Sequence, residues 1–341
     1  MTAVFKSSRR RSYFIGSIVI AGILICSVVL TRGRAMVSPE NWGYYALLDN
    51  MNGITVIQIA EGVPKLLVRG FVQGTPWRVA GIQRARDTGN VYLVPYRIDS
   101  NLELGVRTFP GFKRTIWTQP IGMFWISPDE NSIAYMDTTS VSNLWFQRKN
   151  GSTPVLIAND WVSDSETVWL SSDKLAYLNQ NGRVIEVSVA TKERKELPIW
   201  NYSIGAISPS GDTILLRPFA TREPIPYSDS IYKYDVKSGR VTFLAKWTGR
   251  LVGSRFVWSQ SGAGFFFQRP VVLTLLRLSE AKDLFFFDLN SGKDMRIRLG
   301  IPRFRLQGGF QISENEATEL LSAMRTFPRD LEAVSQEPKN P

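Results

Sequence analysis

The chain has 341 residues, with 41 Lys and Arg against 30 Asp and Glu, no His and a single Cys, Cys26. This length allows a large core, and ten Trp, nineteen Phe and eleven Tyr are typical of a folded protein. Without imidazole or a second thiol, the chain cannot build a Ser-His-Asp or Cys-His catalytic group, a His or Cys zinc site, or an internal disulfide. The sequence therefore disfavours an enzyme, although it does not settle the question, and it predicts no cofactor and no metal site.

An uncharged apolar segment, residues 13–31, follows a basic segment, residues 1–12. Nineteen helical residues reach roughly 28 Å, close to the hydrocarbon thickness of a bilayer. Residues 1–35 contain six basic residues and no acidic one, which is more than half of the net charge of +11. This excess flanks the apolar segment, where basic residues set membrane topology, and does not indicate nucleic-acid binding. We expect no nucleic-acid partner and a single transmembrane helix over residues 13–31.

The basic residues before the apolar segment outnumber those after it, which favours a cytoplasmic amino terminus. The sequence thus predicts a single-pass signal anchor in the plasma (bacterial inner) membrane, in contact with the lipid bilayer through residues 13–31. The rest of the chain would be periplasmic or extracellular. Cleavage after the "GRA" that ends at Ala35 is the alternative, since small residues precede signal-peptidase sites.

A turn followed by an apolar strand recurs along residues 36–313. The anchors of this pattern lie 38 to 54 residues apart, in the range of four-stranded propeller blades. They are Ser38, Ala85, Ser127, Leu170, Ser208, Ser259 and Ser313.

Each repeat unit has the same internal order: an apolar strand, a Ser-Pro-Asp/Ser turn or a variant of it, and three further strands. Ser, Pro and Gly fit the successive positions of such turns. The third and fourth strands are joined by a glycine turn in most units, whereas the fourth unit has Thr191-Lys192 at this place. Several strands are apolar on both faces, as expected for sheets packed between sheets.

The stretches "ISPDENSIAYMD" and "ISPSGDTILLRP", with the apolar strands and glycine turns that follow them, resemble the TolB-type propeller repeat. The resemblance covers roughly residues 36–312 and implies an all-β propeller. The count of repeat units predicts a six-bladed β-propeller, with seven blades as the alternative, and the apolar segment 13–31 predicts one N-terminal transmembrane helix before it. It implies little about function, because propellers of this kind serve as binding platforms, assembly factors and non-catalytic domains of peptidases.

The ring is expected to close through the two ends of residues 36–313. The first unit lacks an innermost strand, and "RLQGGFQIS", Arg305 to Ser313, is an innermost strand without a unit of its own. Pairing the two removes two free edges. Residues 314–341 form a tail that begins either with a short helix capped by Ser313 and Glu316 or with a seventh blade.

Within each blade, the loop from strand two to strand three and the link from strand four to the next blade lie on the same face of the disc. The candidate ligand residues gather on that face. Five tryptophans fall at blade ends and could form an aromatic rim for sugars or peptides, or could pack between blades. Two long loops, residues 217–230 and 268–283, could also carry binding. The predicted ligand residues are Trp77, Trp117, Trp161, Trp200, Trp247, Arg217, Arg222, Tyr227, Arg269 and Arg277. Residues 65–114 add a mild basic field of nine basic and three acidic residues.

We therefore expect a membrane-tethered, non-catalytic binding or scaffold propeller with a protein or glycan partner on its face. The alternative is a carbohydrate-active or other hydrolytic propeller that uses paired carboxylates. Asp235 and Asp288 each precede a glycine turn, where aspartate commonly accepts backbone hydrogen bonds, so neither is a favoured catalytic residue.

Overall fold

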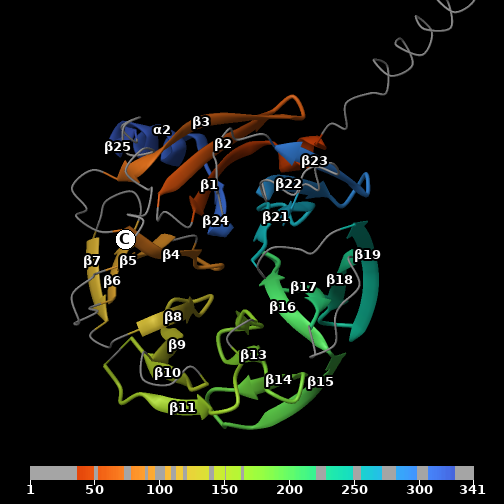
Figure 1. The fold of residues 1–341 in the computed structure, drawn as a ribbon. Helices are drawn as coiled ribbons and strands as arrows, with labels where there is room; N and C mark the ends of the chain where they lie inside the picture. Colours follow the sequence, from red (N-terminus) through yellow and green to blue (C-terminus); the bar gives the residue numbers. More distant parts are fainter. Residues whose placement is uncertain are drawn as a thin grey trace, which may run out of the picture. The chain divides into compact units, whose positions relative to one another are not determined.

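Antiparallel strands from six sheets surround a common centre in the computed structural model (Figure 1). The structure describes residues 37–49, 53–72, 78–88, 91–96, 104–108, 113–117, 121–137, 142–149, 151–162, 165–219, 228–248, 255–270, 282–297 and 306–326. The strand-rich architecture confirms an all-β propeller. Among the described residues, no helix is both long and apolar enough to cross a bilayer, and the segment 13–31 lies outside them.

Sheet 1 joins the two ends of the described chain, with the strand order β24-β1-β2-β3-β25. It contains β1 (Gly43–Asp49), β2 (Ile54–Ala60), β3 (Val63–Val72), β24 (Leu306–Ile312) and β25 (Met324–Thr326). The 3-10 helix η1 (Pro39–Asn41) leads into it.

The other five sheets have four strands each, and neighbours along the chain pair with one another. Sheet 2 contains β4 (Arg78–Arg84), β5 (Val91–Tyr96), β6 (Leu104–Thr108) and β7 (Lys113–Trp117); sheet 3 contains β8 (Ile121–Ile126), β9 (Ser132–Asp137), β10 (Leu144–Arg148) and β11 (Val155–Ala158). Sheet 4 contains β12 (Val168–Trp169), β13 (Lys174–Leu178), β14 (Arg183–Ser188) and β15 (Arg194–Trp200). Sheet 5 contains β16 (Tyr202–Ile207), β17 (Thr213–Pro218), β18 (Ser228–Asp235) and β19 (Arg240–Thr248); sheet 6 contains β20 (Val257–Trp258), β21 (Gly264–Pro270), β22 (Lys282–Asp288) and β23 (Lys293–Ile297).

The recurring serine of the first turn has a structural task. Its hydroxyl oxygen accepts the first backbone N–H of the next strand, five residues on, and the buried turn is thereby satisfied. The Oγ atoms of Ser127, Ser208 and Ser259 accept the N–H groups of Ser132, Thr213 and Gly264 at 2.9, 3.1 and 3.1 Å. All three serines are buried, which explains why this residue type repeats along the sequence.

The departure at Thr191-Lys192 also has a physical explanation. Lys192 has φ +61°, while Gly239 and Gly292, in the corresponding turns of sheets 5 and 6, have φ +69° and +66°. The fourth unit therefore keeps the same left-handed turn with a lysine in place of glycine, at some cost in backbone strain.

The predicted closure is confirmed by the pairing of β1 with β24. Tyr44 lies opposite Ile312, and Ala46 lies opposite Phe310, in an antiparallel register. The segment that leads into β1 is tied to sheet 6 by Asp288 at the end of β22, whose Oδ2 accepts the backbone N–H of Ser38 at 2.6 Å. Strand and loop contacts thus join the start of the described chain to its last sheets.

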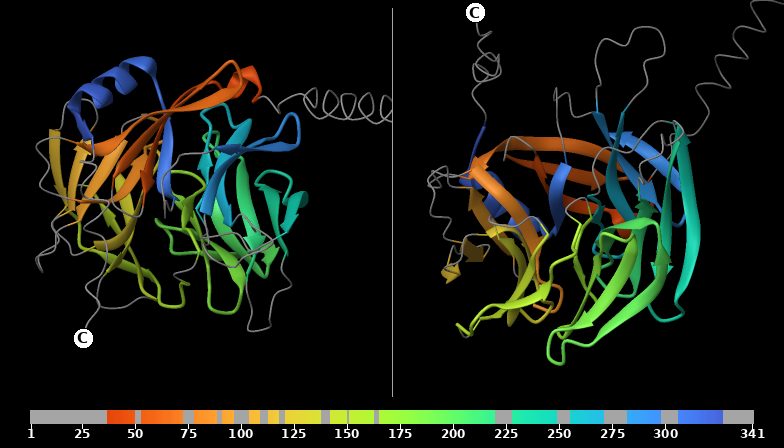
Figure 2. Two further views of the ribbon diagram at one scale, coloured as in Figure 1. Left: turned by 45° about the horizontal axis from the view of Figure 1, so that its top comes forward. Right: turned by 60° about the horizontal axis from the view of Figure 1, so that its bottom comes forward.

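The tail begins with the capped helix and not with a further sheet. Ser313 and Glu316 form the reciprocal capping box that starts helix α2 (Glu314–Ala323). The helix packs along sheet 1 (Figure 2), and β25 then pairs with β3 as its outermost strand. The segment that could have begun a seventh blade instead covers the edge of sheet 1.

Apolar side chains fill the interfaces between neighbouring sheets. Between sheets 1 and 6, the ring of Tyr45 meets that of Phe266 edge-on at 4.7 Å, and Phe266 meets Phe286 at 4.8 Å. All three are essentially without solvent exposure. Sheets that are apolar on both faces are therefore covered on both faces, as the sequence pattern predicts.

Candidate functional site: a central polar cavity

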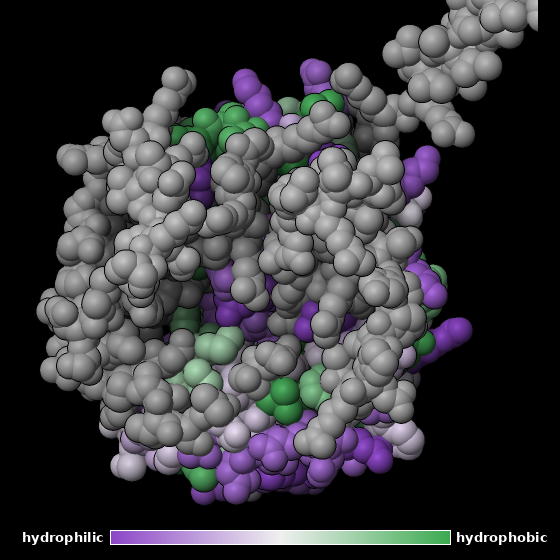
Figure 3. Space-filling model, in the orientation of Figure 1, coloured by the Kyte–Doolittle hydropathy of each residue, from purple (hydrophilic) through white to green (hydrophobic). Residues whose placement is uncertain are grey.

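The innermost strands enclose a cavity of about 280 Å³. β24, β4, β8 and β16 lie nearest the centre in Figure 1, and residues from each of them line the cavity. The ring is hollowed at its centre, with hydrophilic side chains visible there (Figure 3). The cavity is thus the described space in which residues from most of the sheets converge.

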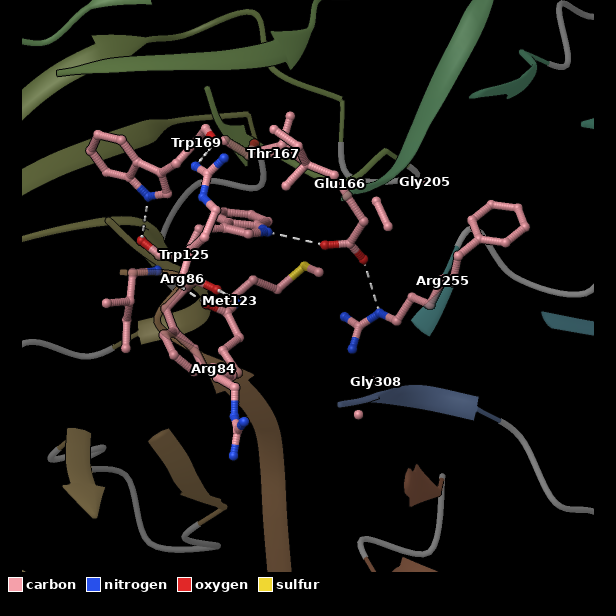
Figure 4. A pocket seen from close by; sticks show the side chains of 18 of the residues that line it. Arg84, Arg86, Met123, Trp125, Glu166, Thr167, Trp169, Gly205, Arg255 and Gly308 are labelled. Atoms are coloured by element: carbon pink, nitrogen blue, oxygen red, sulfur yellow. Dashed lines mark hydrogen bonds and ion pairs between the residues drawn. The ribbon is translucent and has the colours of Figure 1, made fainter. Parts of the chain in front are cut away.

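Glu166 and Arg255 form an ion pair across this cavity, with 3.0 Å between Oε1 and Nε (Figure 4). Glu166 precedes β12 of sheet 4 and Arg255 precedes β20 of sheet 6, so the pair passes over Gly205 of the intervening β16. Their side chains are 17% and 27% exposed, which places the pair in contact with the solvent of the cavity.

Both carboxylate oxygens of Glu166 are occupied. Its Oε2 accepts the indole N–H of Trp125 at 3.0 Å, and Arg255 in turn donates to the carbonyl oxygen of Gln307. The chain of contacts runs from sheet 3 through sheets 4 and 6 to sheet 1. Among the described residues that line the cavity, Glu166 is the single carboxylate.

Arg84 belongs to the wall near sheet 1. Its guanidinium donates to Oε1 of Glu316 at 2.5 Å and lies over the ring of Phe310, 5.1 Å from the centroid. Burial would raise the pKa of Glu316, but the backbone N–H of Ser313 and the charge of Arg84 outweigh it and hold this pKa below its usual value. The helix α2 is therefore linked to the cavity wall by a charged contact.

Arg86 crosses one end of the cavity from the first turn of sheet 2. Its Nη2 donates to the carbonyl oxygen of Trp169 in sheet 4 at 2.6 Å, and its Nη1 lies against Gly211 in the first turn of sheet 5. Burial lowers the pKa of Arg86, and the nearby charge of Asp87 offsets this only in part. An arginine still remains protonated at neutral pH, so a desolvated positive charge lies at this end.

Of the predicted aromatic rim, the structure describes the side chains of Trp161 and Trp200, and these two lie in different environments. Trp161 is 1% exposed and packs edge-on against Trp125, with 5.6 Å between ring centroids; it is therefore an interior residue. Trp200, at the end of β15, is 58% exposed and is stacked by the guanidinium of Arg183, 4.1 Å from its ring. Trp200 is thus the described tryptophan of this set that is available at the surface.

Of the remaining predicted residues, Arg217 is half-buried, and the others have only a backbone position or none. Trp117 ends β7, and Trp247 lies in β19 opposite Asp229. Arg217 and Arg269 lie in strands β17 and β21, and not in loops as predicted, because these strands extend into the ranges expected to be loops. Trp77, Arg222, Tyr227 and Arg277 lie outside the described residues.

The cavity residues were missed because their common location depends on ring closure. One signal was present: Glu166 and Arg255 each precede a repeat anchor, Leu170 and Ser259, by four residues. Charged residues at equal positions of innermost strands must converge when the ring closes. The predicted basic region, residues 65–114, does contain Arg84 and Arg86, but the sequence did not predict where in the fold they would lie.

The aspartates before the glycine turns act as the sequence predicts. Asp235 accepts the N–H of Ser238 at 2.6 Å, and Asp288 accepts those of Asn290 and Ser291 at 2.9 and 3.0 Å. Both are committed to turn structure.

Comparison with known structures supports the fold. A crystal structure of TolB from Acinetobacter baumannii is similar over 80% of this chain and 68% of that chain, with 12% identity and a TM-score of 0.58. The fold is a TolB-like β-propeller.

Weaker similarity extends to two further solved structures. An oligogalacturonate lyase in complex with manganese has 11% identity and a TM-score of 0.47 over 72% of this chain and 70% of that one. The β-propeller domain of Cps50 (Swd1) from Myceliophteria thermophila has 10% identity and a TM-score of 0.47 over 80% and 88%. No protein-family model and no curated protein matches the sequence.

Proposed function

We propose that this chain is a non-catalytic binding or scaffold propeller of six blades, held at a membrane by residues 13–31, with its propeller in the periplasm or outside the cell. The likeness to the TolB fold supports the architecture. The uncharged segment and its flanking basic residues support the anchor and its orientation. The partner is a protein on the face that carries Trp200, where an exposed aromatic ring suits a protein interface.

One observation carries the choice of a binding module over a hydrolase. Glycoside hydrolysis by paired carboxylates needs two carboxyl groups about 5–10 Å apart around the substrate. The described wall of the cavity contributes one carboxylate. Its Oε2 already accepts a hydrogen bond from Trp125, and its Oε1 is paired with the guanidinium of Arg255. An ion-paired carboxylate that links four sheets is suited to holding a scaffold together.

Crosslinking tests the partner. The full-length chain, expressed in its own membrane and crosslinked before solubilisation, should recover one protein reproducibly. Trp200→Ala should reduce that recovery strongly, while Leu156→Ala, which removes an exposed apolar side chain on the outer strand β11, should not. Equal recovery with both variants, or no constant partner, would contradict the proposed face.

A topology reporter tests the location separately. An enzyme that is active only outside the cytoplasm, fused after residue 341, should be active in cells. Activity of a cytoplasm-specific reporter at the same position would instead refute the orientation. Sequencing the amino terminus of the mature protein decides between an anchor and cleavage after Ala35.

A further inference from the structure

The cavity wall carries more positive than negative charge. Three arginines, Arg84, Arg86 and Arg255, line it against one glutamate, Glu166. Glu316 pairs with Arg84, and Glu166 pairs with Arg255. Arg86 therefore supplies the excess charge, and a cavity with low-dielectric walls strengthens its field.

Arg86 is placed to receive a ligand. A guanidinium has five N–H groups, and one of those of Arg86 is used on the Trp169 carbonyl oxygen. The side chain is half-buried at the end of the cavity, and its burial is only partly compensated by Asp87. Such a group gains most from an anionic partner, because charge-assisted hydrogen bonds are the strong ones.

Two further donors in the wall have no partner among the described residues. The hydroxyl of Thr167, a residue that is 1% exposed, and the Nε of Arg84 are both buried and make no hydrogen bond there. Thr167 lies two residues before Trp169, the residue that Arg86 contacts, and both line the cavity (Figure 4). The Thr167 hydroxyl has almost no accessible surface, so a ligand in the cavity reaches it through a rotation of the Thr167 side chain. The hydrogen bond formed then removes the free-energy cost of leaving this buried polar group unpaired.

We propose that the central cavity binds a small anion that presents carboxylate or phosphate oxygens, with Arg86 and Thr167 as its main contacts. The volume of about 280 Å³ suits a small ligand or a single acidic group. The Glu166–Arg255 pair limits the net charge of the site and so favours a ligand of low charge. This inference goes beyond the proposed function, since a protein partner can bind the outer face without entering the cavity.

Titration calorimetry of the full-length chain in detergent, at low ionic strength, tests the site with citrate and with inorganic phosphate. At least one of them should bind saturably with one site per chain, while chloride at matched ionic strength should not compete. Absence of saturable binding for both citrate and phosphate would overturn the inference.

Variants of the two contacts then identify the site. Arg86→Gln should weaken binding about tenfold to a hundredfold, as expected for a lost hydrogen bond to a charged group. Thr167→Val, which keeps the side-chain shape, should weaken it about threefold to tenfold. Arg183→Gln, which removes an arginine outside the cavity, is the matched control and should change the Kd less than twofold.

An unchanged Kd in folded Arg86→Gln protein would overturn the inference. Should Arg86→Gln fail to fold, an unchanged Kd in Thr167→Val would have the same meaning. A hexapeptide of glutamate with an amidated end distinguishes the sources of the anion. Displacement of citrate by the peptide indicates an acidic segment of a partner, and its failure beside citrate binding indicates a free small anion. A chain that recovers its protein partner but binds neither anion would overturn this inference alone.

Discussion

The interfaces between the sheets and the cavity that the sheets surround belong to the same propeller but have opposite chemistry. Between sheets 1 and 6, the rings of Tyr45, Phe266 and Phe286 are fully buried. At the cavity, by contrast, Glu166 and Arg255, which precede the innermost strands β12 and β20, pair in a partly solvated space. Stability of the ring therefore depends on the interfaces, whereas the cavity is free to vary in charge, and the two should respond differently to substitution.

The largest expected effect lies in the apolar interface. Phe266→Ala should reduce the free energy of unfolding by about 3–5 kcal/mol, because it removes a buried ring and leaves a cavity. Denaturant unfolding of the full-length chain followed by Trp fluorescence measures this loss. Phe243→Ala, at a ring that is 53% exposed, is the control and should cost less than about 1 kcal/mol. Similar losses of unfolding free energy for both variants would show that the apolar interface does not dominate stability.

A buried polar contact within this closing interface should have the next largest effect. Asp288→Asn should cost roughly 1–3 kcal/mol, since the carboxylate accepts hydrogen bonds from Ser38 and from two turn residues. Burial would raise the pKa of Asp288, but these backbone hydrogen bonds outweigh it and hold the pKa below its usual value. A depressed pKa stabilises the folded state above the unfolded value of about 3.9, and this stabilisation is lost as the pH falls through the folded pKa.

Comparing unfolding at pH 7 and at about pH 3 checks this sign. The difference in stability between wild type and Asp288→Asn should shrink at the lower pH. A difference that stays constant would show that the charge of Asp288 does not contribute.

The cavity should respond less in stability and more in binding. Glu166→Gln should cost about 1–2 kcal/mol, between the values for exposed and buried ion pairs, because Arg255 loses its counter-charge in a partly solvated place. The same change should tighten citrate binding several-fold, since it removes the one carboxylate of the described wall. Calorimetry measures the citrate affinity and denaturant unfolding measures the stability, both on one preparation of the variant. A large loss of stability without a gain in binding would make the pair part of the structural interface.

The smallest effect is expected at a turn that belongs to neither region. Lys192→Gly should stabilise the chain by up to about 1 kcal/mol, because glycine adopts φ +61° without the strain of a side chain. The same substitution at Lys195, the second residue of β15, should destabilise instead. Equal effects at both positions would show that backbone strain at Lys192 is negligible.

The sequence predicted what local chemistry determines. The serine turns, the pairing of residues 306–312 with the first unit and the capping box of Ser313 and Glu316 each follow from short stretches with a physical reason. It did not predict which aromatic residues would be buried. Trp161 and Trp200 both fall at blade ends, and the hydropathy of a tryptophan is the same in a core as on a rim.

The residues that line the cavity could not be predicted from local sequence for a different reason. Glu166 and Arg255 are 89 residues apart in the chain, and their contact depends on the angle through which successive sheets rotate. That angle is set by packing of whole side-chain layers. Neither local stretch encodes it alone, and the signal lies in the equal positions of the two residues before their repeat anchors.

The pairing of β1 with β24 has a consequence for how the protein is made. More than 250 residues separate Asp49 from Leu306, and at roughly 5–20 residues per second the ribosome needs tens of seconds to pass from one to the other. Throughout that time β1 has one edge with unsatisfied backbone groups, open to pairing with any other extended segment. The edge of β1 must therefore avoid pairing with other segments until β24 has been synthesised.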